Sequence, residues 1–296
     1  MANERSKVVD FLTWLPQGAV LGLLRALPYR ARLALGSALL RTAVACSAGL
    51  RRRIDRNLAF IFPEKPEAER VRIRRQTADT FGRTFTETFT ARAFQARAPW
   101  SEPSGPGWDA LQATLAEGRG ALLVGGHFGQ WEAVRGALKA RGIEVGALYR
   151  PLNNPWVERT YLDNMSFHGS PMLPRGREGM KALIRHLKAG GVVAVLLDQY
   201  VLDGAPIEFV GRPAPTGTAV AALAARFKVP MIPAYGTRQP DGVTIAIDFE
   251  APLAPGTPEA MTQAAADSLS ARIRRHPGQY YWLHRRWKKN FQSRVD

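Results

Sequence analysis

Cysteine is almost absent from the 296-residue chain, which contains only Cys46. One thiol cannot form an intrachain disulfide or a cysteine-based zinc site. Cys46 lies in an apolar stretch, so we expect a small, buried, apolar side chain. His168 and His186 have no partners at the spacing of metal ligands. The sequence therefore predicts no metal site, and we expect no cofactor.

A long uncharged apolar run is also missing. A helix needs about 20 apolar residues to cross a bilayer, whereas the stretch 11–24 is shorter and contains Pro16. A second stretch, 33–50, is interrupted by Arg41. Short apolar segments among arginines are typical of helices that lie in a membrane surface. The alternatives are a helical hairpin packed on the protein's own core, or a tilted span over residues 8–28.

Acidic residues are few relative to basic ones. Lys and Arg total 41 against 25 Asp and Glu, which gives a formal net charge of +16. Such a field attracts polyanions, namely nucleic acid, anionic lipid head groups or an acidic carrier protein. Nucleic acid remains only a remote alternative, because no zinc-finger, helix-turn-helix or RNA-recognition signature is visible.

The chain divides by composition near the loop Pro99–Gly107, which is rich in proline and glycine. Residues 1–100 are expected to form a helical, basic, membrane-associating region, and residues 101–296 an α/β core. Strands are expected at 121–124, 145–149, 192–197, 231–235 and 243–249. Helices are expected at 108–116, 132–141, 154–167, 179–189, 219–227 and 257–276. This alternation predicts an α/β fold with a mixed, mainly parallel sheet flanked by helices.

The segment 121–132, Ala-Leu-Leu-Val-Gly-Gly-His-Phe-Gly-Gln-Trp-Glu, is the most informative one. A buried strand ends in two glycines, His127 follows, and a helix begins within a few residues. Ligands of parallel sheets bind beyond the carboxyl ends of the strands. The start of the helix also offers unpaired backbone N–H groups that favour a developing negative charge.

His127 and Glu132 are predicted to form a catalytic pair. Five positions on a regular helix would separate them by about 140°, but His127 lies in the turn, where glycines allow the chain to bend. A neutral imidazole can take the proton of an attacking hydroxyl, and a carboxylate can orient the ring. Because no serine or cysteine lies in a nucleophile-elbow pattern, we expect direct transfer without an acyl-enzyme.

Six ordered motifs across nearly the whole chain resemble the lipid A late acyltransferases, which belong to the lysophospholipid acyltransferase superfamily. The matching segments are Arg56-Asn57-Leu58 with Phe62-Pro63-Glu64, His127-Phe-Gly-Gln-Trp-Glu132, Arg175-Gly-Arg177, Asp198-Gln199, Phe209–Gly217 and Gln279–Lys288. One departure is Leu197, which stands before Asp198 where many family members have proline.

The resemblance implies a glycerolipid acyltransferase-like fold and the transfer of a fatty acyl chain from acyl carrier protein to a hydroxyl of a phosphorylated lipid A precursor. It implies His127 as the general base, Glu132 as its charge partner, Arg177 as a ligand of a negative group or the oxyanion, and Asp198 as an organising carboxylate. Further substrate-binding residues are implied at Gln199, Thr216, Gly217, His284, Arg285 and Arg286.

The implied location is the cytoplasmic face of the cell inner membrane, whose anionic surface would attract the arginines by about 1 kcal/mol each. The acceptor remains open between a lipid A precursor and a lysophospholipid or other glycolipid. A catalytically inactive scaffold on the same fold is a further alternative, and the intact pair His127 and Glu132 argues against it.

Overall fold

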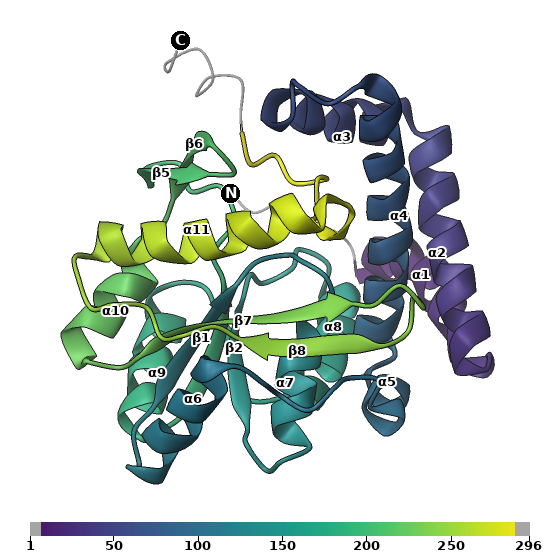
Figure 1. Ribbon diagram of the computed structural model, residues 1–296. Helices are drawn as coiled ribbons and strands as arrows, with labels where there is room; N and C mark the ends of the chain where they lie inside the picture. Colours follow the sequence, from purple (N-terminus) through teal and green to yellow (C-terminus); the bar gives the residue numbers. More distant parts are fainter. Residues whose placement is uncertain (1–6, 288–296) are drawn as a thin grey trace.

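The computed structural model in Figure 1 describes residues 7–287. All elements before residue 100 are helices, which are coloured purple to blue and lie together at one end of the sheet. They are α1 (Lys7–Ala26), α2 (Tyr29–Cys46), α3 (Ala48–Ile61), α4 (Glu67–Phe89) and α5 (Ala91–Arg97). The close packing of α2 on α4 requires glycine, because a Cβ on Gly36 or Gly82 would clash with the opposite helix.

A six-stranded sheet forms the centre of the rest of the chain. Its spatial order is β3-β2-β4-β1-β7-β8. The strands are β1 (Ala121–Gly125), β2 (Val145–Tyr149), β3 (Met172–Pro174), β4 (Val192–Leu196), β7 (Met231–Arg238) and β8 (Ile245–Phe249). All neighbours are parallel except β7 and β8, which are antiparallel. The central strands β1 and β4 are rich in valine and leucine because both faces of the sheet are covered.

Successive residues of β1 point to opposite faces of the sheet and pack against different helices, as expected from the two-residue period of a strand. Leu123 belongs to a core with α6 (Pro106–Ala116) and α7 (Glu132–Lys139). Leu122 and Val124 belong to a core on the other face. That face carries α9 (Arg177–Lys188), α10 (Ala219–Phe227) and α11 (Pro258–Arg275). The sheet is therefore the middle layer of three.

A third apolar core joins the helical region to the end of the chain. It contains residues of α3 and α4, of the hairpin β5 (Ala205–Phe209) and β6 (Arg212–Thr216), and of the segment after η1 (Pro277–Gln279). Trp282 is fully buried there and makes an edge contact with Phe62, with ring centroids 5.7 Å apart. This packing holds the segment 280–287 beside the sheet.

The predicted fold class is confirmed, and the expected strands and helices are all present with shifts of a few residues. Three strands were not predicted: β3, with only three residues, and the hairpin β5–β6, which contains several prolines. The expectation for Cys46 was wrong, because it is exposed. It is the last residue of α2, and the buried face of that turn is occupied by Val44 instead.

Within residues 7–287, no single helix is both long and apolar enough to cross a membrane. Helices α2 and α3 meet that test together, but only as a pair bent by 90°. Helix α1 lies against the start of α8 (Pro155–His168), where Trp14 donates to Thr160 and its ring contacts Trp156. Much of its apolar surface is exposed, including Val8, Leu12 and Leu23.

Candidate active site

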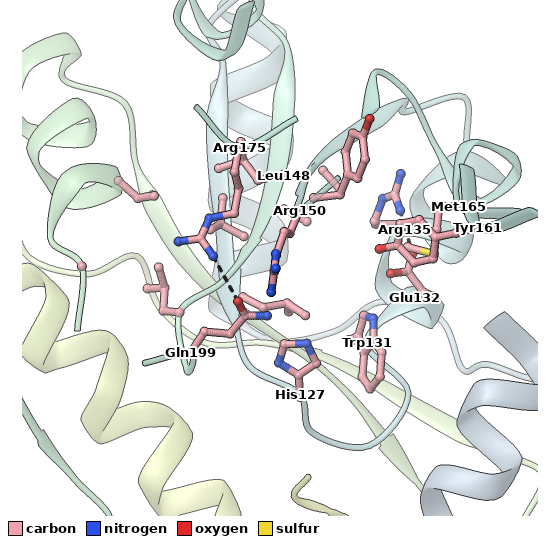
Figure 2. Close-up of a pocket in the computed structure, with 18 of the residues that line it drawn as sticks. His127, Trp131, Glu132, Arg135, Leu148, Arg150, Tyr161, Met165, Arg175 and Gln199 are labelled. Atoms are coloured by element: carbon pink, nitrogen blue, oxygen red, sulfur yellow. Dashed lines mark hydrogen bonds and ion pairs between the residues drawn. The ribbon is translucent and has the colours of Figure 1, made fainter. Parts of the chain in front are cut away.

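A cavity of about 710 Å³ opens at the carboxyl ends of β1, β2 and β4. Figure 2 shows His127 at one side of this cavity, with Trp131, Arg150, Arg175 and Gln199 around it. Its wall is mostly apolar and is formed by residues such as Phe85, Phe89, Leu148, Met165, Met180, Val195, Leu196 and Val220. An elongated apolar ligand with a polar end fits this lining.

His127 is bonded to Asp198 through both its ring and its backbone. The ring Nδ1 lies 2.8 Å from Asp198 Oδ1, and the backbone N–H donates to Asp198 Oδ2 at 2.9 Å. The sheet explains this pairing, because β1 and β4 are parallel neighbours in which Gly125 is paired with Leu196. His127 and Asp198 each follow that pair by two residues, so they meet where the strands end.

The turn that carries His127 needs glycine at two positions. A Cβ on Gly126 would lie 2.3 Å from Leu269 Cδ2 and 3.1 Å from the carboxyl carbon of Asp198. Gly129 has a positive φ of 55° and packs against the Gly236 carbonyl. The turn also pairs with the end of the chain, since Tyr281 N–H donates to the His127 carbonyl at 3.0 Å.

The ionised carboxylate of Asp198 decides which tautomer a neutral His127 ring adopts. Asp198 is fully buried, which opposes ionisation, but the adjacent His127 holds the pKa of its carboxyl well below the usual range. An ionised carboxylate only accepts hydrogen bonds, so we assign the proton of the neutral ring to Nδ1. The lone pair then lies on Nε2. His127 is 16 % exposed, in keeping with its place in the cavity wall.

Glu132 does not bond to His127 as the sequence predicted. It is the first residue of α7, is 2 % exposed, and accepts from Arg135 Nη1 at 2.7 Å. Figure 2 shows Trp131 between His127 and the pair Glu132–Arg135. The turn at 127–131 directs the imidazole toward β4, whereas the first turn of α7 directs Glu132 toward a residue three positions later on the same helix face.

His284 contacts the imidazole of His127 edge-on, with ring centroids 4.5 Å apart. It lines the same cavity, and no hydrogen-bond partner for its buried Nε2 lies within the part of the chain that the structure describes. Burial, and then the nearby His127 and Arg286, lower the pKa of His284 to about 4. It is therefore neutral at pH 7.

Comparison with known proteins identifies the family of the chain that carries this site. The sequence matches the family described as bacterial lipid A biosynthesis acyltransferase over residues 2–289. It is 32 % identical over 291 residues to the lipid A biosynthesis lauroyltransferase of Escherichia coli K12. This alignment covers 94 % of this chain and 92 % of the relative. The chain belongs to the bacterial lipid A biosynthesis acyltransferase family. It is an acyltransferase.

Two other relatives of this acyltransferase carry different names. The lipid A biosynthesis palmitoleoyltransferase of Escherichia coli K12 is 30 % identical in an alignment of 289 residues that covers 94 % of this chain and 91 % of the relative. A phosphatidylinositol mannoside acyltransferase of Mycobacterium tuberculosis is 24 % identical in an alignment of 241 residues that covers 79 % of this chain and 76 % of the relative.

The other predicted site residues of the acyltransferase fall into three groups. Arg177, Gln199 and Gly217 line the same cavity as His127 and His284. Thr216 and Arg286 are buried and bonded to each other, with Arg286 Nη1 also donating to the carbonyls of Gln199 and Pro215. Arg285 lies at a second cavity instead. Lys288, the end of the closing motif, lies outside the described residues.

Sequence reasoning missed several residues that shape the cavity of the acyltransferase. Arg135 ties Glu132 to the wall by donating to the carbonyls of Val145 and Gly169. The three-residue spacing of Glu132 and Arg135 on a helix was the signal that could have predicted their pairing. The missed wall residues are Trp131, Arg150, Tyr161 and Tyr281.

Buried Gln130 is a further residue that was missed. It donates to the Thr84 carbonyl at 3.2 Å and to Glu87 at 2.7 Å, and thereby fixes the turn that carries His127 to α4. Glu87 is itself paired with buried Arg238. Because buried polar groups are costly when unpaired, this network holds the turn in one position.

Three side chains of the acyltransferase could together hold a metal ion. His127, Asp198 and His284 each offer one ligand atom, and these atoms lie within 4.8 Å of one another. Two imidazoles and a carboxylate are the donor set that suits zinc or iron.

Proposed function

We propose that the chain transfers a fatty acyl group from acyl carrier protein to a hydroxyl of a lipid A precursor. The observation that carries this proposal is the His127–Asp198 pair, whose imidazole lines a mostly apolar cavity. The family and the lauroyl and palmitoleoyl relatives support the substrate class.

In the proposed reaction, His127 is the general base. Its Nε2 takes the proton of the acceptor hydroxyl while the oxygen attacks the carbonyl carbon of the acyl thioester. The carbonyl π electrons move onto its oxygen. When the tetrahedral species collapses, the C–S bond breaks, and the thiolate receives the proton from the imidazolium. The products are an ester and a free thiol, and no acyl-enzyme forms.

Charged groups around the cavity stabilise this sequence of steps. Asp198 orients the ring of His127 and stabilises the imidazolium. Arg177, the first residue of α9, provides a positive charge at the cavity wall for the oxyanion or another negative group. Glu132, which the sequence proposes as the partner of His127, acts through Arg135 by holding the opposite wall in place.

The acyl chain occupies the apolar part of the cavity, and α1 provides the route from the membrane. Trp156 of α8 contacts Phe11 and Trp14 of α1, while Tyr161 of the same helix lines the cavity. A helix with exposed valines and leucines and a tryptophan fits the interface of a bilayer. These contacts support association with a membrane surface, and we propose that this surface is the cytoplasmic face of the inner membrane.

The decisive experiment is mass spectrometry of envelope lipid from cells with and without the gene. We expect lipid A from cells without the gene to lack one acyl chain. Purified enzyme should add this chain in vitro when the fatty acyl thioester of acyl carrier protein is supplied. An unchanged lipid A would refute the proposal. The matched control is the His127→Ala variant, which should fold like the wild type and lose several orders of magnitude in turnover.

The choice of donor is tested by ionic strength. A chain with a net charge of +16 attracts an acidic carrier, so the KM for acyl carrier protein should rise with salt. The same acyl group on N-acetylcysteamine, which is neutral and small, should show no such change. Equal salt responses for the two donors would rule out recognition of an acidic carrier.

A second candidate acceptor is a phosphatidylinositol mannoside, because relatives with that activity align with 79 % of the chain. A lysophospholipid or another glycolipid is the corresponding broader alternative. Assays of the purified enzyme with each acceptor at equal concentration distinguish them. Faster acylation of the mannoside or the lysophospholipid than of the lipid A precursor would replace the first proposal.

A further inference from the structure

A second cavity, of about 550 Å³, lies between α3 and the end of the described chain. We call it the arginine cavity, and it is lined by Gly49, Arg52, Arg53, Arg56, Asn57, Arg285 and Trp287. The three arginines of α3 lie at positions i, i+1 and i+4, which places them on one side of the helix. Arg285 faces them from the segment that also carries His284.

The four arginines of this cavity have no acidic partner within residues 7–287. No ion pair of the described chain includes any of them. Asp55, the acidic residue of α3, is bonded to Arg74 instead. Like charges gathered in one concave site repel each other, and an anion that enters the site removes that repulsion.

A buried amide joins the two segments that line the arginine cavity. Asn57 is buried, and its Nδ2 donates to the Trp282 carbonyl at 2.7 Å and to the His284 carbonyl at 2.9 Å. This amide therefore holds α3 against the segment 282–285, so that the arginines of both elements line the same cavity. A site that is organised before binding loses less entropy when a ligand arrives.

Phosphate is the anion that fits this set of groups. A phosphate monoester carries nearly two negative charges and three acceptor oxygens, and guanidinium groups match it with paired hydrogen bonds. A single carboxylate would neutralise only one of four positive charges. The cavity is also large enough to admit part of the molecule to which the phosphate is attached.

The arginine cavity and the catalytic cavity are lined by consecutive residues of one segment. His284 lines the catalytic cavity and Arg285 the arginine cavity, and consecutive Cα atoms are only about 3.8 Å apart. Arg53 is close enough to Tyr281, which lines the catalytic cavity, to affect its pKa. A molecule with its hydroxyl at His127 can therefore place a neighbouring phosphate among the arginines.

From this geometry we infer that the arginine cavity binds a phosphate group of the acceptor and so sets which hydroxyl reaches His127. This inference rests on the proposed function, because it takes the acceptor to be a phosphorylated glycolipid. The other source of a phosphate is the phosphopantetheine arm of the donor, which the experiments below distinguish.

The kinetic test uses the Arg53→Gln/Arg56→Gln variant. We expect the acceptor KM to rise about tenfold or more, since charge-assisted hydrogen bonds to two arginines are lost, while the donor KM is unchanged. The matched control is Arg185→Gln/Arg226→Gln, which removes the same charge from exposed positions on α9 and α10. A rise in donor KM alone, or an equal acceptor effect in the control, would overturn the inference.

A binding test separates this inference from the proposed function. The probe is the phosphorylated glucosamine disaccharide without acyl chains, titrated calorimetrically into the full-length enzyme. We expect binding that is lost on removal of its phosphates and weakened about tenfold or more in Arg53→Gln/Arg56→Gln. Equal affinity for the dephosphorylated disaccharide, or no binding by an enzyme that acylates lipid A normally, would refute the arginine cavity. Normal phosphate binding without acyl transfer would refute the proposed function instead.

Discussion

Replacement of Asp198 by asparagine is the sharpest test of the proposed mechanism. In the structure Asp198 accepts from Nδ1 of His127, which leaves the Nε2 lone pair free for the acceptor hydroxyl. An asparagine amide can donate to Nδ1, which moves the ring proton to Nε2 and blocks the base. The fold should be kept, because the new side chain has the same shape.

The magnitude follows from the distance between the two groups. At 2.8 Å and an effective dielectric constant of about 20, a full imidazolium and a carboxylate interact by about 6 kcal/mol. Because the imidazole carries only part of that charge in the transition state, this value is an upper limit. It corresponds to about 10⁴ in rate, the size of the effect of the equivalent change in serine protease triads.

The assay is single-turnover acyl transfer with saturating donor and acceptor, together with urea unfolding. We expect kcat of Asp198→Asn to fall by about 10³ to 10⁴, with a single cooperative unfolding transition that shows that the fold is kept. A kcat within tenfold of the wild type would show that Asp198 does not orient His127.

Glu132→Gln is the matched comparison. It should lower the free energy of unfolding by about 3 kcal/mol or more, because it leaves buried Arg135 without its partner. Removal of both charges, in Glu132→Gln/Arg135→Met, should recover part of that stability. The opposite outcome would be a Glu132→Gln variant with full stability and a kcat lowered by about 10⁴, together with an Asp198→Asn variant of normal kcat. That outcome would favour the hypothesis that Glu132, and not Asp198, is the partner of His127.

Three further predictions concern chain length, acidity and the membrane. Leu148→Trp narrows the apolar cavity, so mass spectrometry of the product should show a preference for shorter acyl chains, and an unchanged preference would place the chain elsewhere. Burial lowers the pKa of His168 and His284 to about 4, below the unfolded value of 6.5, so the unfolded chain binds more protons in acid. Burial of these two neutral rings therefore does not lower the free energy of unfolding above about pH 7. It lowers the free energy of unfolding progressively as the pH falls toward 4. Urea unfolding should show a loss of about 2 kcal/mol per histidine between pH 7 and pH 5, and a His284→Gln variant with the full wild-type loss would contradict this. Leu12→Ser/Leu23→Ser removes exposed apolar surface from α1, so sedimentation with anionic vesicles should weaken, and undiminished binding would exclude α1 as the membrane contact.

The sequence by itself determined the order of helices and strands and the place of His127. The apolar run before Gly125 and Gly126 has the length of a buried strand, and the two glycines end it, so both the strand and the turn follow from local physics. The short strand β3 and the proline-containing hairpin β5–β6 escaped prediction, because their segments lack the length or composition that marks a strand.

Only the tertiary structure decided which groups act together. His127 and Asp198 are separated by 71 residues, and they meet because β4 is the neighbour of β1 in the sheet, a choice that no local pattern contains. Glu132 is close to His127 in sequence, yet the helix that it begins turns its carboxylate toward Arg135. Arg56 and Arg285 likewise share a cavity only because Asn57 joins α3 to the last described segment. Strand neighbours and helix packing are set by the burial of the whole apolar surface, so contacts between distant residues follow from the complete fold rather than from any one stretch of the chain.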